Sequence, residues 1–480
     1  MSDPLSLLPL ALASREGMID GAPASQYVAA GLTLLQRSAP LVRALSGRRA
    51  GILLPTSPAF LAALAASEGR GAVLMNPLAS APELAYQVAD AGIGAVFTSS
   101  AFADRLPRDT AIALLDSAPR SARIVVGGAT RDVDLGSHIA LAMEGIADVE
   151  GSLDEAAVVY TSAMHGRPLG AILSHRSLLF NARSAIRAAA LTSDEHALAA
   201  LPFSHLFGFL VAGVAPLLAG ARVTTMPRFN PARALEIIVQ DRVTMFVGVP
   251  SMYIAMMDVL EHQRESRLIE TLRLCICGGA PVAPEMQRRW KDLTGIELRQ
   301  GYGLTETSSG CLCNIVAAPN VIGALGQPYP GVEVAIRDAR TFTPTPDGLV
   351  GEICVRGPTV FEGYVVAPGA APPTGLEVRD EWLRSGDLGV RRPDGFIEFR
   401  GLIKPMFTRN GFNIYPRELE VAIAELSGVT EVRARSMPDP VKENAIVVDV
   451  RGAVTVDDVR LWCAARLSAY KQPSIINVAP

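Results

Sequence analysis

The stretch Arg299-Gln300-Gly301-Tyr302-Gly303-Leu304-Thr305-Glu306-Thr307 is the most informative part of this 480-residue chain. It follows a segment, residues 272–280, that reads as a buried strand running into a glycine turn. A helical segment, residues 284–293, lies between the two. Strands that alternate with helices are typical of parallel sheets whose faces are covered by helices. The stretch and its surroundings therefore predict an α/β fold.

The side chains of this stretch favour a ligand-binding turn. Gly301 and Gly303 allow the backbone to turn tightly and to approach a ligand closely. Tyr302 offers a flat face to a base, Thr305 a hydroxyl to a phosphate oxygen, and Glu306 a hard oxygen to Mg²⁺. This combination suits a nucleotide with its metal ion. The alternative is a structural turn in which Thr305 caps a helix and Glu306 supports it.

The same alternation of strands and helices runs through the rest of the chain. In the first hundred residues we expect helices at 26–46, 58–68 and 81–91, and strands at 50–55, 72–75 and 95–98. Further on we expect a strand at 158–162, which opens through a loop into a helix at 177–190, a strand at 245–249, and antiparallel strands at 331–336 and 351–356. The last segment predicts helices at 418–426 and 456–467 and strands at 432–435 and 446–450.

Composition excludes several classes of function. Apolar residues make up 49% and charged residues 19% of the chain, and the formal net charge is only -4. Neither a nucleic-acid footprint nor a polybasic membrane patch is implied. Residues 1–12 are apolar but lack a basic start, and the apolar run 209–220 is too short to span a bilayer. We therefore expect a cytoplasmic protein.

The six cysteines predict buried positions rather than a metal centre. They are Cys275, Cys277, Cys311, Cys313, Cys354 and Cys463. Alternation places Cys275 and Cys277 on one face of a strand, where cysteine behaves as a small apolar residue. The Cys-x-Cys spacing has no accompanying histidine pair, which disfavours zinc.

Two further motifs give the chain a family resemblance. Residues 158–175 read Val-Val-Tyr-Thr-Ser-Ala-Met-His-Gly-Arg-Pro-Leu-Gly-Ala-Ile-Leu-Ser-His, and residues 384–389 read Arg-Ser-Gly-Asp-Leu-Gly, followed by the segment 411–420. With the stretch at 299–307, and in this order, they resemble the acyl-CoA synthetases of the adenylate-forming superfamily. The resemblance covers the chain from about residue 51 to its last residue.

The resemblance implies an architecture as well as an activity. It implies a large α/β domain, residues 1–403, with parallel-rich sheets covered by helices and a small barrel-like part. A small, mobile α+β domain, residues 404–480, would follow a hinge near Lys404. The implied reaction activates a carboxylic acid with ATP and Mg²⁺ and passes the acyl group to a thiol, CoA or the pantetheine of a carrier protein. A monomer or homodimer with no membrane span and no nucleic-acid partner is expected.

Individual roles follow from the matching positions. Thr305, Glu306 and His205 would be catalytic, with Glu306 on the Mg²⁺; for His205 the alternative is a buried histidine paired to backbone. The positions implied to bind nucleotide or pantetheine are Thr161, Ser162, Gly166, Gly279, Ala280, Tyr302, Gly303, Asp387 and Gly411. Asp387, in a predicted turn, would hold the ribose hydroxyls. The implied acyl pocket is formed by Phe203, Phe207, Met252, Gly278, Gly279 and Cys311, an apolar lining that suits a fatty or aryl acid.

The chain departs from the family pattern in its phosphate loop. The family reads Thr-Ser-Gly-Thr-Thr-Gly-x-Pro-Lys-Gly, whereas here Ala163, Met164 and His165 replace the glycine and two hydroxyls. Leu169 replaces the lysine, which removes a charge-assisted bond to phosphate worth about 1.5–3 kcal/mol. His165 is either a phosphate donor or a solvent-facing histidine.

The hinge and the C-terminal segment also depart from the pattern. Leu402 stands where the family has arginine, and Pro405 follows the pivot and restricts it. The family carries a catalytic lysine in a Gly-Lys turn beyond the Tyr470-Lys471-Gln472-Pro473 stretch, and the sequence reaches Pro480 before such a turn. Lys471 itself is expected to be a surface cation. Three functions stay open: a ligase, an enzyme of the thioester half-reaction only, and a pseudoenzyme that binds nucleotide or acyl ligand.

Overall fold

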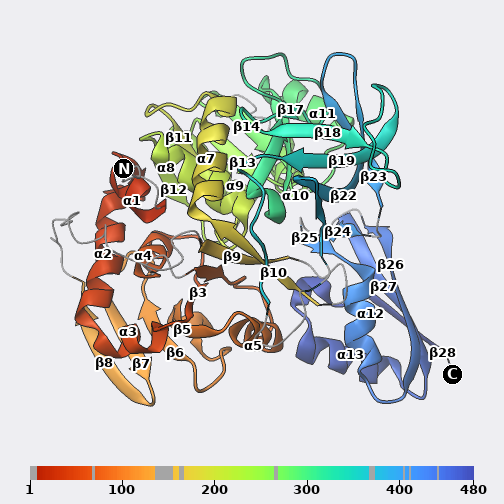
Figure 1. Ribbon diagram of the computed structural model, residues 1–480. Helices are drawn as coiled ribbons and strands as arrows, with labels where there is room; N and C mark the ends of the chain where they lie inside the picture. Colours follow the sequence, from red (N-terminus) through yellow and green to blue (C-terminus); the bar gives the residue numbers. More distant parts are fainter. Residues whose placement is uncertain are drawn as a thin grey trace.

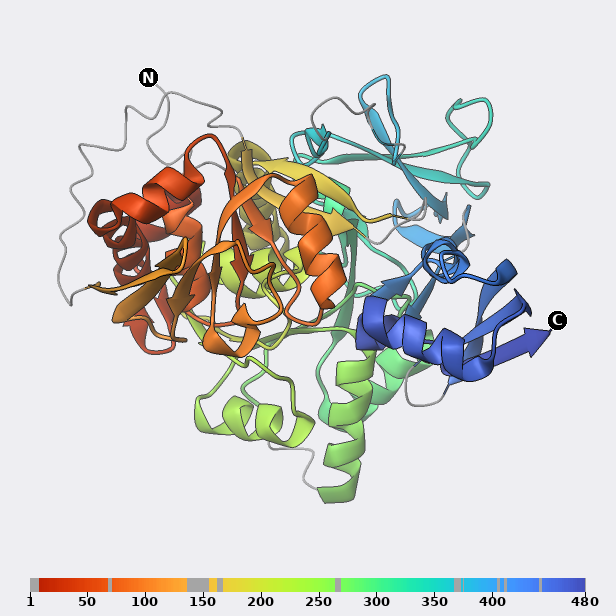
Figure 2. The same cartoon turned by 90° about the horizontal axis from the view of Figure 1, so that it is seen from below.

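The protein is described here as a computed structural model in which two bodies carry separate cores. The structure describes residues 8–67, 71–135, 155–161, 167–263, 269–366, 373, 375–403, 406–409, 412–439 and 443–479. Figures 1 and 2 show a large N-terminal body and a smaller C-terminal body beside it. We use these names for the described residues up to 403 and from 406 on. The exact boundary predicted at residues 403 and 404 stays a prediction.

The first sheet of the N-terminal body has nine strands in the order β20-β10-β9-β4-β3-β5-β6-β7-β8. Its strands are β3 (Arg49–Leu53), β4 (Ala72–Leu74), β5 (Ile93–Thr98), β6 (Ala111–Leu115), β7 (Ser121–Val126), β8 (Ala129–Asp134), β9 (Glu155–Thr161), β10 (Leu169–Ser174) and β20 (Gly363–Tyr364). The central strands β9, β4, β3, β5 and β6 pair in parallel, while the strands at either edge pair antiparallel.

The second sheet has nine strands in the order β17-β16-β15-β14-β13-β11-β12-β1-β2. They are β1 (Met18–Ile19), β2 (Ala22–Pro23), β11 (His196–Ala199), β12 (Arg222–Thr225), β13 (Met245–Gly248), β14 (Leu274–Cys277), β15 (Leu298–Leu304), β16 (Ser309–Cys313) and β17 (Gln327–Pro328). From β1 to β15 the neighbours are parallel. The expected parallel α/β sheets are therefore confirmed.

Apolar helices fill the space between the elements and complete the core. The helices of the N-terminal body are α1 (Leu8–Ala13), α2 (Ala24–Arg37), α3 (Ala39–Leu45), α4 (Ala59–Ala66), α5 (Ala81–Asp90), α6 (Ser100–Ala103), α7 (His175–Ala189), η2 (Phe207–Val214), α8 (Ala215–Leu218), α9 (Pro231–Gln240), α10 (Pro250–Gln263), α11 (Pro284–Thr294) and η4 (Thr305–Thr307). Every residue of α4 is buried, as expected for a helix that is apolar all round. All six cysteines are free and buried.

A small antiparallel sheet and the C-terminal body complete the structure. The small sheet contains β18 (Glu333–Arg337), β19 (Val350–Arg356), β21 (Val378–Arg379), β22 (Trp382–Arg391) and β23 (Ile397–Leu402). The C-terminal body contains β24 (Phe407–Arg409), β25 (Phe412–Ile414), α12 (Pro416–Ala424), β26 (Val429–Asp439), β27 (Glu443–Gly452), α13 (Val456–Arg466), η5 (Ala469–Lys471) and β28 (Ile475–Ala479). It has an apolar core of its own. No helix in the described part of the chain is long and apolar enough to cross a membrane.

Two expected elements differ in the structure. The helix predicted at 26–46 is broken into α2 and α3 at Ser38, whose hydroxyl accepts the N–H of Leu41 at 3.3 Å. Pro40 in the first turn favours this restart. The predicted strand–loop–helix around residue 170 contains an additional strand, β10, antiparallel to β9. The substituted loop thus connects two antiparallel strands, and α7 begins only after Ser174, which caps it.

Candidate active site

The turn at the end of β15 has a fixed backbone shape. β15 leaves the parallel sheet and pairs antiparallel with β16, with a register shift between Tyr302 and Gly303. A Cβ at Gly303 would come within 1.7 Å of the carbonyl oxygen of Ser309, so only glycine fits there. The hydroxyl of Thr307 accepts the N–H of Leu304 at 2.8 Å. Thr307 therefore closes the single 3-10 turn η4.

This arrangement decides between the two interpretations of the turn. The capping alternative assigned the structural bond to Thr305, and that assignment is wrong because Thr307 makes it. The Thr305 side chain makes no hydrogen bond within the described residues and is partly exposed. Its hydroxyl thus remains available to a ligand.

Tyr302 and Asp387 meet at the centre of the site. The Tyr302 hydroxyl donates to Oδ2 of Asp387 at 2.6 Å. Burial raises the pKa of Asp387 to about 6, and Glu352 and Glu306 add to that rise while the Tyr302 hydrogen bond opposes it. Asp387 is not in a simple turn, as the sequence predicted, but inside the long strand β22. Gly386, with φ +76°, bends that strand just before it.

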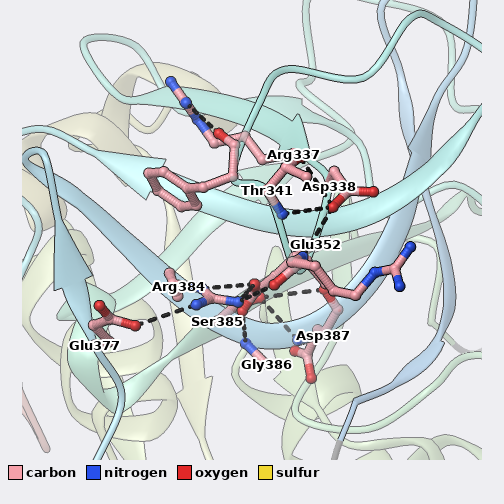
Figure 3. A network of polar contacts seen from close by, with 12 residues as sticks. Arg337, Asp338, Thr341, Glu352, Glu377, Arg384, Ser385, Gly386 and Asp387 are labelled. Atoms are coloured by element: carbon pink, nitrogen blue, oxygen red, sulfur yellow. Dashed lines mark hydrogen bonds and ion pairs between the residues drawn. The ribbon is translucent and has the colours of Figure 1, made fainter.

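A buried carboxylate on the neighbouring strand β19 fixes the position of Asp387. Figure 3 shows Glu352 between Arg384 and the backbone of Gly386. Glu352 pairs with Arg384 at 2.6 Å and accepts the N–H of Gly386 at 3.0 Å. The N–H of Asp387 donates to the hydroxyl of Ser385 at 3.0 Å. The bend that presents the Asp387 carboxylate is therefore held by a charged network that the sequence motif did not reveal.

Glu306 lies in the same turn and is buried, with 6% of its surface exposed. Its Oε1 accepts the hydroxyl of Tyr364 at 2.7 Å, and its carbonyl oxygen accepts the N–H of Phe361 at 3.0 Å. Burial raises the pKa of Glu306, and the hydrogen bond from Tyr364 opposes that rise.

The C-terminal body reaches this site from the other side. The ring of Phe412 contacts the ring of His205, with centroids 6.1 Å apart. Burial raises the pKa of Tyr415, and the charges of Glu306 and Asp387 raise it further, which places its phenol near both carboxylates. The His205 ring makes no hydrogen bond within the described chain, so the backbone pairing of the alternative is wrong, while desolvation by its surroundings lowers the pKa of its imidazole.

The other expected nucleotide-binding positions are only partly brought together. Gly279 is exposed at the end of β14 with φ +75°, and Ala280 is half-exposed beside it. The hydroxyl of Thr161 donates to the carbonyl oxygen of Leu169 at 3.3 Å across the β9–β10 hairpin. Ser162, Gly166 and Gly411 lie outside the described residues, as do His165, Lys404 and Pro405.

Most of the expected acyl-pocket residues are buried. The ring of Phe207 covers Gly278, where an added Cβ would meet a ring carbon at 3.3 Å. Met252 is buried at the start of α10. Cys311 is buried near Thr307, and burial raises the pKa of its thiol to about 12. Phe203 lies in the core, edge-on to Phe60 with ring centroids 5.6 Å apart, and is only 1% exposed.

Comparison with known proteins identifies the family of the chain. The AMP-binding enzyme family matches residues 39–365. The chain belongs to the AMP-binding enzymes. The adenylate-forming resemblance seen in the motifs is thereby confirmed, and an AMP-binding enzyme is expected to bind ATP or AMP.

Similar proteins narrow the class of this AMP-binding enzyme. The chain is similar to a feruloyl-CoA synthase of Amycolatopsis sp, with 33% identity over 440 residues, 90% of this chain and 84% of the relative. It is 27% identical to a long-chain-fatty-acid–CoA ligase of Bacillus subtilis (strain 168), over 89% and 81% of the two chains. A malonyl-CoA ligase solved with methylmalonyl-CoA and AMP superposes with a TM-score of 0.79 at 26% identity, covering 96% of this chain and 95% of that one. The chain is accordingly an enzyme of the acid–thiol ligase class.

Proposed function

We propose that this AMP-binding enzyme converts a carboxylic acid, ATP and CoA into an acyl-CoA, AMP and pyrophosphate. The observation that carries the proposal is the pairing of Tyr302 with Asp387 one turn away from Glu306. A flat ring and a two-oxygen acceptor suit a base and a ribose, and a nearby carboxylate suits the metal on the phosphates.

The first half-reaction joins the acid to the nucleotide. A carboxylate oxygen of the acid attacks the α-phosphorus of ATP, the bond to the bridging oxygen breaks, and pyrophosphate leaves with its electron pair. The Thr305 hydroxyl donates to an α-phosphate oxygen on which charge develops. The Oε2 atom of Glu306 would hold Mg²⁺, and the ion would neutralise charge on the phosphates.

The second half-reaction transfers the acyl group to the thiol. The CoA sulfur attacks the acyl carbonyl, the bond to the phosphate oxygen breaks, AMP leaves and the thiol proton passes to solvent. His205 lies beside Phe412 at the junction of the two bodies. We assign it to the rim of the channel through which the thiol approaches.

The acid is a fatty or aryl acid in this proposal. Support comes from Phe207, Met252 and Cys311, which are apolar and carry no charge at neutral pH. A buried ammonium or second carboxylate on the substrate would need an oppositely charged partner. Phe203 supports this lining from the core instead of touching the acid. The cytoplasmic location and the monomeric or homodimeric state stay predictions.

The test is ATP–pyrophosphate exchange with a panel of fatty and aryl acids, followed by thioester formation with CoA. We expect exchange that depends on the acid, and a CoA thioester of the same acid. Thioester formation only from supplied acyl-adenylate would replace this proposal by an enzyme of the second half-reaction. Nucleotide binding without exchange or thioester formation for every acid would replace it by a pseudoenzyme.

Removal of the Asp387 carboxylate is expected to weaken nucleotide binding. Asp387→Ala should lower the affinity for AMP by about 1.5–3 kcal/mol, the usual worth of hydrogen bonds to a charged group. Calorimetry with AMP measures this directly. Tyr302→Phe, which breaks the same hydrogen bond from the other side but keeps the ring and the carboxylate, is the matched control and should retain most of the affinity. Equal losses in both variants would contradict the ribose role of Asp387.

Acid pH should weaken nucleoside binding through the same carboxylate. Because the pKa of Asp387 is about 6, most of it is ionised at pH 7 and most of it is protonated at pH 5. The affinity for adenosine, which has no phosphate to titrate, should fall about tenfold between these two pH values. Asp387→Asn cannot titrate there and should show a flat profile, whereas a parallel fall in that variant would contradict the assignment.

The fold itself should not be lost over this range because of Asp387. Its folded pKa lies above the ordinary value of 3.8, so the folded state binds the proton more tightly than the unfolded state. The contribution of this group to stability therefore increases as the pH falls from about 6 to 4. Reduced adenosine binding at pH 5 would thus report protonation of the site rather than unfolding.

A further inference from the structure

One segment outside the recognised motifs holds Glu306 at both ends. The N–H of Phe361 donates to the main-chain oxygen of Glu306 at 3.0 Å. Three residues later, the hydroxyl of Tyr364 donates to its side-chain Oε1 at 2.7 Å. Glu306 is buried, and these two hydrogen bonds hold its backbone and one of its carboxylate oxygens.

The hydrogen bond from Tyr364 has a defined direction. The N–H of Leu376 donates to the Tyr364 hydroxyl oxygen at 3.1 Å. A backbone N–H can only donate, so the oxygen of the phenol accepts from Leu376 and its single proton is directed to Glu306. The hydroxyl proton of Tyr364 therefore occupies Oε1 of Glu306, and Oε2 has no hydrogen-bond partner among the described side chains.

The phenol is itself rigidly placed. Tyr364 forms strand β20, which pairs with β10 at Ala171. Its ring packs edge-on to Phe361 with centroids 4.8 Å apart. A Cβ at Gly375 would come within 2.0 Å of the ring, so the chain passes directly over it. The residue that orients Glu306 is thus anchored to the strand that follows the phosphate loop.

We propose that Tyr364 is a positioning residue that turns Oε2 of Glu306 towards the metal of the bound metal–nucleotide. This inference rests on the proposed function, in which Glu306 binds that metal. Tyr364 acts through Glu306 and does not touch the reacting atoms. Partners of this kind, which orient a metal ligand, typically change metal affinity or activity by about 10–100-fold when they are replaced.

The experiment measures metal affinity apart from turnover. Mn²⁺ replaces Mg²⁺, and electron paramagnetic resonance titrates its binding to the protein with α,β-methylene-ATP, an analogue that cannot release pyrophosphate. Tyr364→Phe keeps the ring contacts and removes only the hydroxyl. We expect it to weaken Mn²⁺ binding by about 10–100-fold, with metal-free AMP affinity unchanged. Tyr253→Phe is the control, because it removes another buried hydroxyl, which donates to the carbonyl oxygens of Phe246 and Ile276 instead of to a carboxylate.

A double-mutant cycle separates the inference from the proposed function. If Tyr364 acts through Glu306, Tyr364→Phe should have no further effect on Mn²⁺ affinity in the background of Glu306→Gln. Weakened binding in Glu306→Gln with wild-type binding in Tyr364→Phe would overturn the positioning role and leave the proposed function standing. Wild-type Mn²⁺ binding in Glu306→Gln would overturn the metal assignment, and the positioning role with it.

Discussion

Lys471→Met is expected to destabilise the C-terminal body by about 3–5 kcal/mol, because it removes one member of a buried charged group. Lys471 Nζ lies 2.8 Å from Oε1 of Glu83 in the N-terminal body and also pairs with Glu418 in its own body. Only 6% of the lysine side chain is exposed. Burial alone would lower the pKa of Lys471, but Glu418 and Glu83 raise it, so the ammonium stays charged.

The destabilisation of the Lys471→Met variant comes mainly from Glu418, which loses its charged partner. Glu83 keeps other donors, since it accepts the N–H of Ser80 at 2.7 Å and the hydroxyl of Ser468. Glu418 is buried, and its Oε2 already lacks a hydrogen-bond partner among the residues that the structure describes. Without Lys471 this carboxylate would be an uncompensated charge in the interior. An unpaired buried charge strongly lowers the stability of the folded state.

The free energy of unfolding is measured by urea titration of the full chain, with tryptophan fluorescence as the signal. Trp462 in α13 reports on the C-terminal body, with its indole N–H bonded to the carbonyl oxygen of Ala422 at 2.7 Å. The matched control replaces Lys471 by Met and both Glu83 and Glu418 by Gln. Removing the whole charged group should recover most of the loss, because replacing all members is often neutral. If the free energy of unfolding of Lys471→Met lies within about 1 kcal/mol of the wild-type value, the buried charged group contributes little to stability.

Acid pH should remove the stability that the ion pair between Glu83 and Lys471 contributes. Burial would raise the pKa of Glu83, but Lys471 and the two hydrogen bonds lower it below the ordinary 4.5. The stability from this carboxylate is therefore complete at neutral pH and is lost as the pH falls below 4.5 towards the folded value. In Lys471→Met this acid-sensitive part of the stability should be absent.

Lys471 also shows where sequence reasoning stopped short. The sequence predicted a surface cation, since lysine is rarely buried without a partner. Its partner Glu83 is 388 residues away, and no local pattern connects the two. The contact exists only because η5 of the C-terminal body lies against α5, as Figure 1 shows for the neighbouring α13 and α5.

The fold was predictable where the signal was local. Strands and helices alternate with clear apolar periods, so the parallel sheets followed from the sequence alone. The break at Ser38 was missed, although a serine followed by Pro40 is a signal for a helix start. Strand β10 was missed because Leu169–Ser174 is short and mostly buried, so it has no alternation to distinguish it from a loop.

The residues of the candidate site were likewise predicted only in part. The motifs placed Tyr302, Glu306 and Asp387 together, because each lies close to a glycine in a motif of recognisable order. Tyr364 and Glu352 were not found, although they orient two of these three side chains. Their sequence signals are a glycine before Tyr364 and a short apolar strand around Glu352, and both signals are common in strands and turns.

Leu169→Lys is expected to raise acid-dependent ATP–pyrophosphate exchange by about 100–1000-fold, equivalent to about 2.7–4 kcal/mol of barrier. The estimate takes a preorganised donor at an oxyanion as its analogue, because charge develops on the phosphates as pyrophosphate leaves. Leu169 is the first residue of β10 and pairs with Thr161, so a lysine there would start from a fixed backbone. The leucine is half-exposed, and its replacement therefore leaves no buried cavity.

The measurement combines a rate with two affinities. In the wild type, AMP and ATP should bind within a factor of ten, or about 1.4 kcal/mol, because the base and ribose positions are retained while the loop cation is not. In Leu169→Lys, ATP should be favoured over AMP. Leu169→Met, of similar length and without charge, is the control and should change neither quantity.

The pattern of the two readouts identifies what the cation does. A rise in exchange together with tighter ATP binding means that the lysine holds the phosphates before and during the reaction. Tighter ATP binding with an unchanged rate means uniform binding, which does not lower the barrier from the bound state. If exchange and the ATP-to-AMP ratio both stay at the wild-type values, the loop that precedes Leu169 does not bring the phosphates within reach, and Leu169 does not account for a weak first half-reaction.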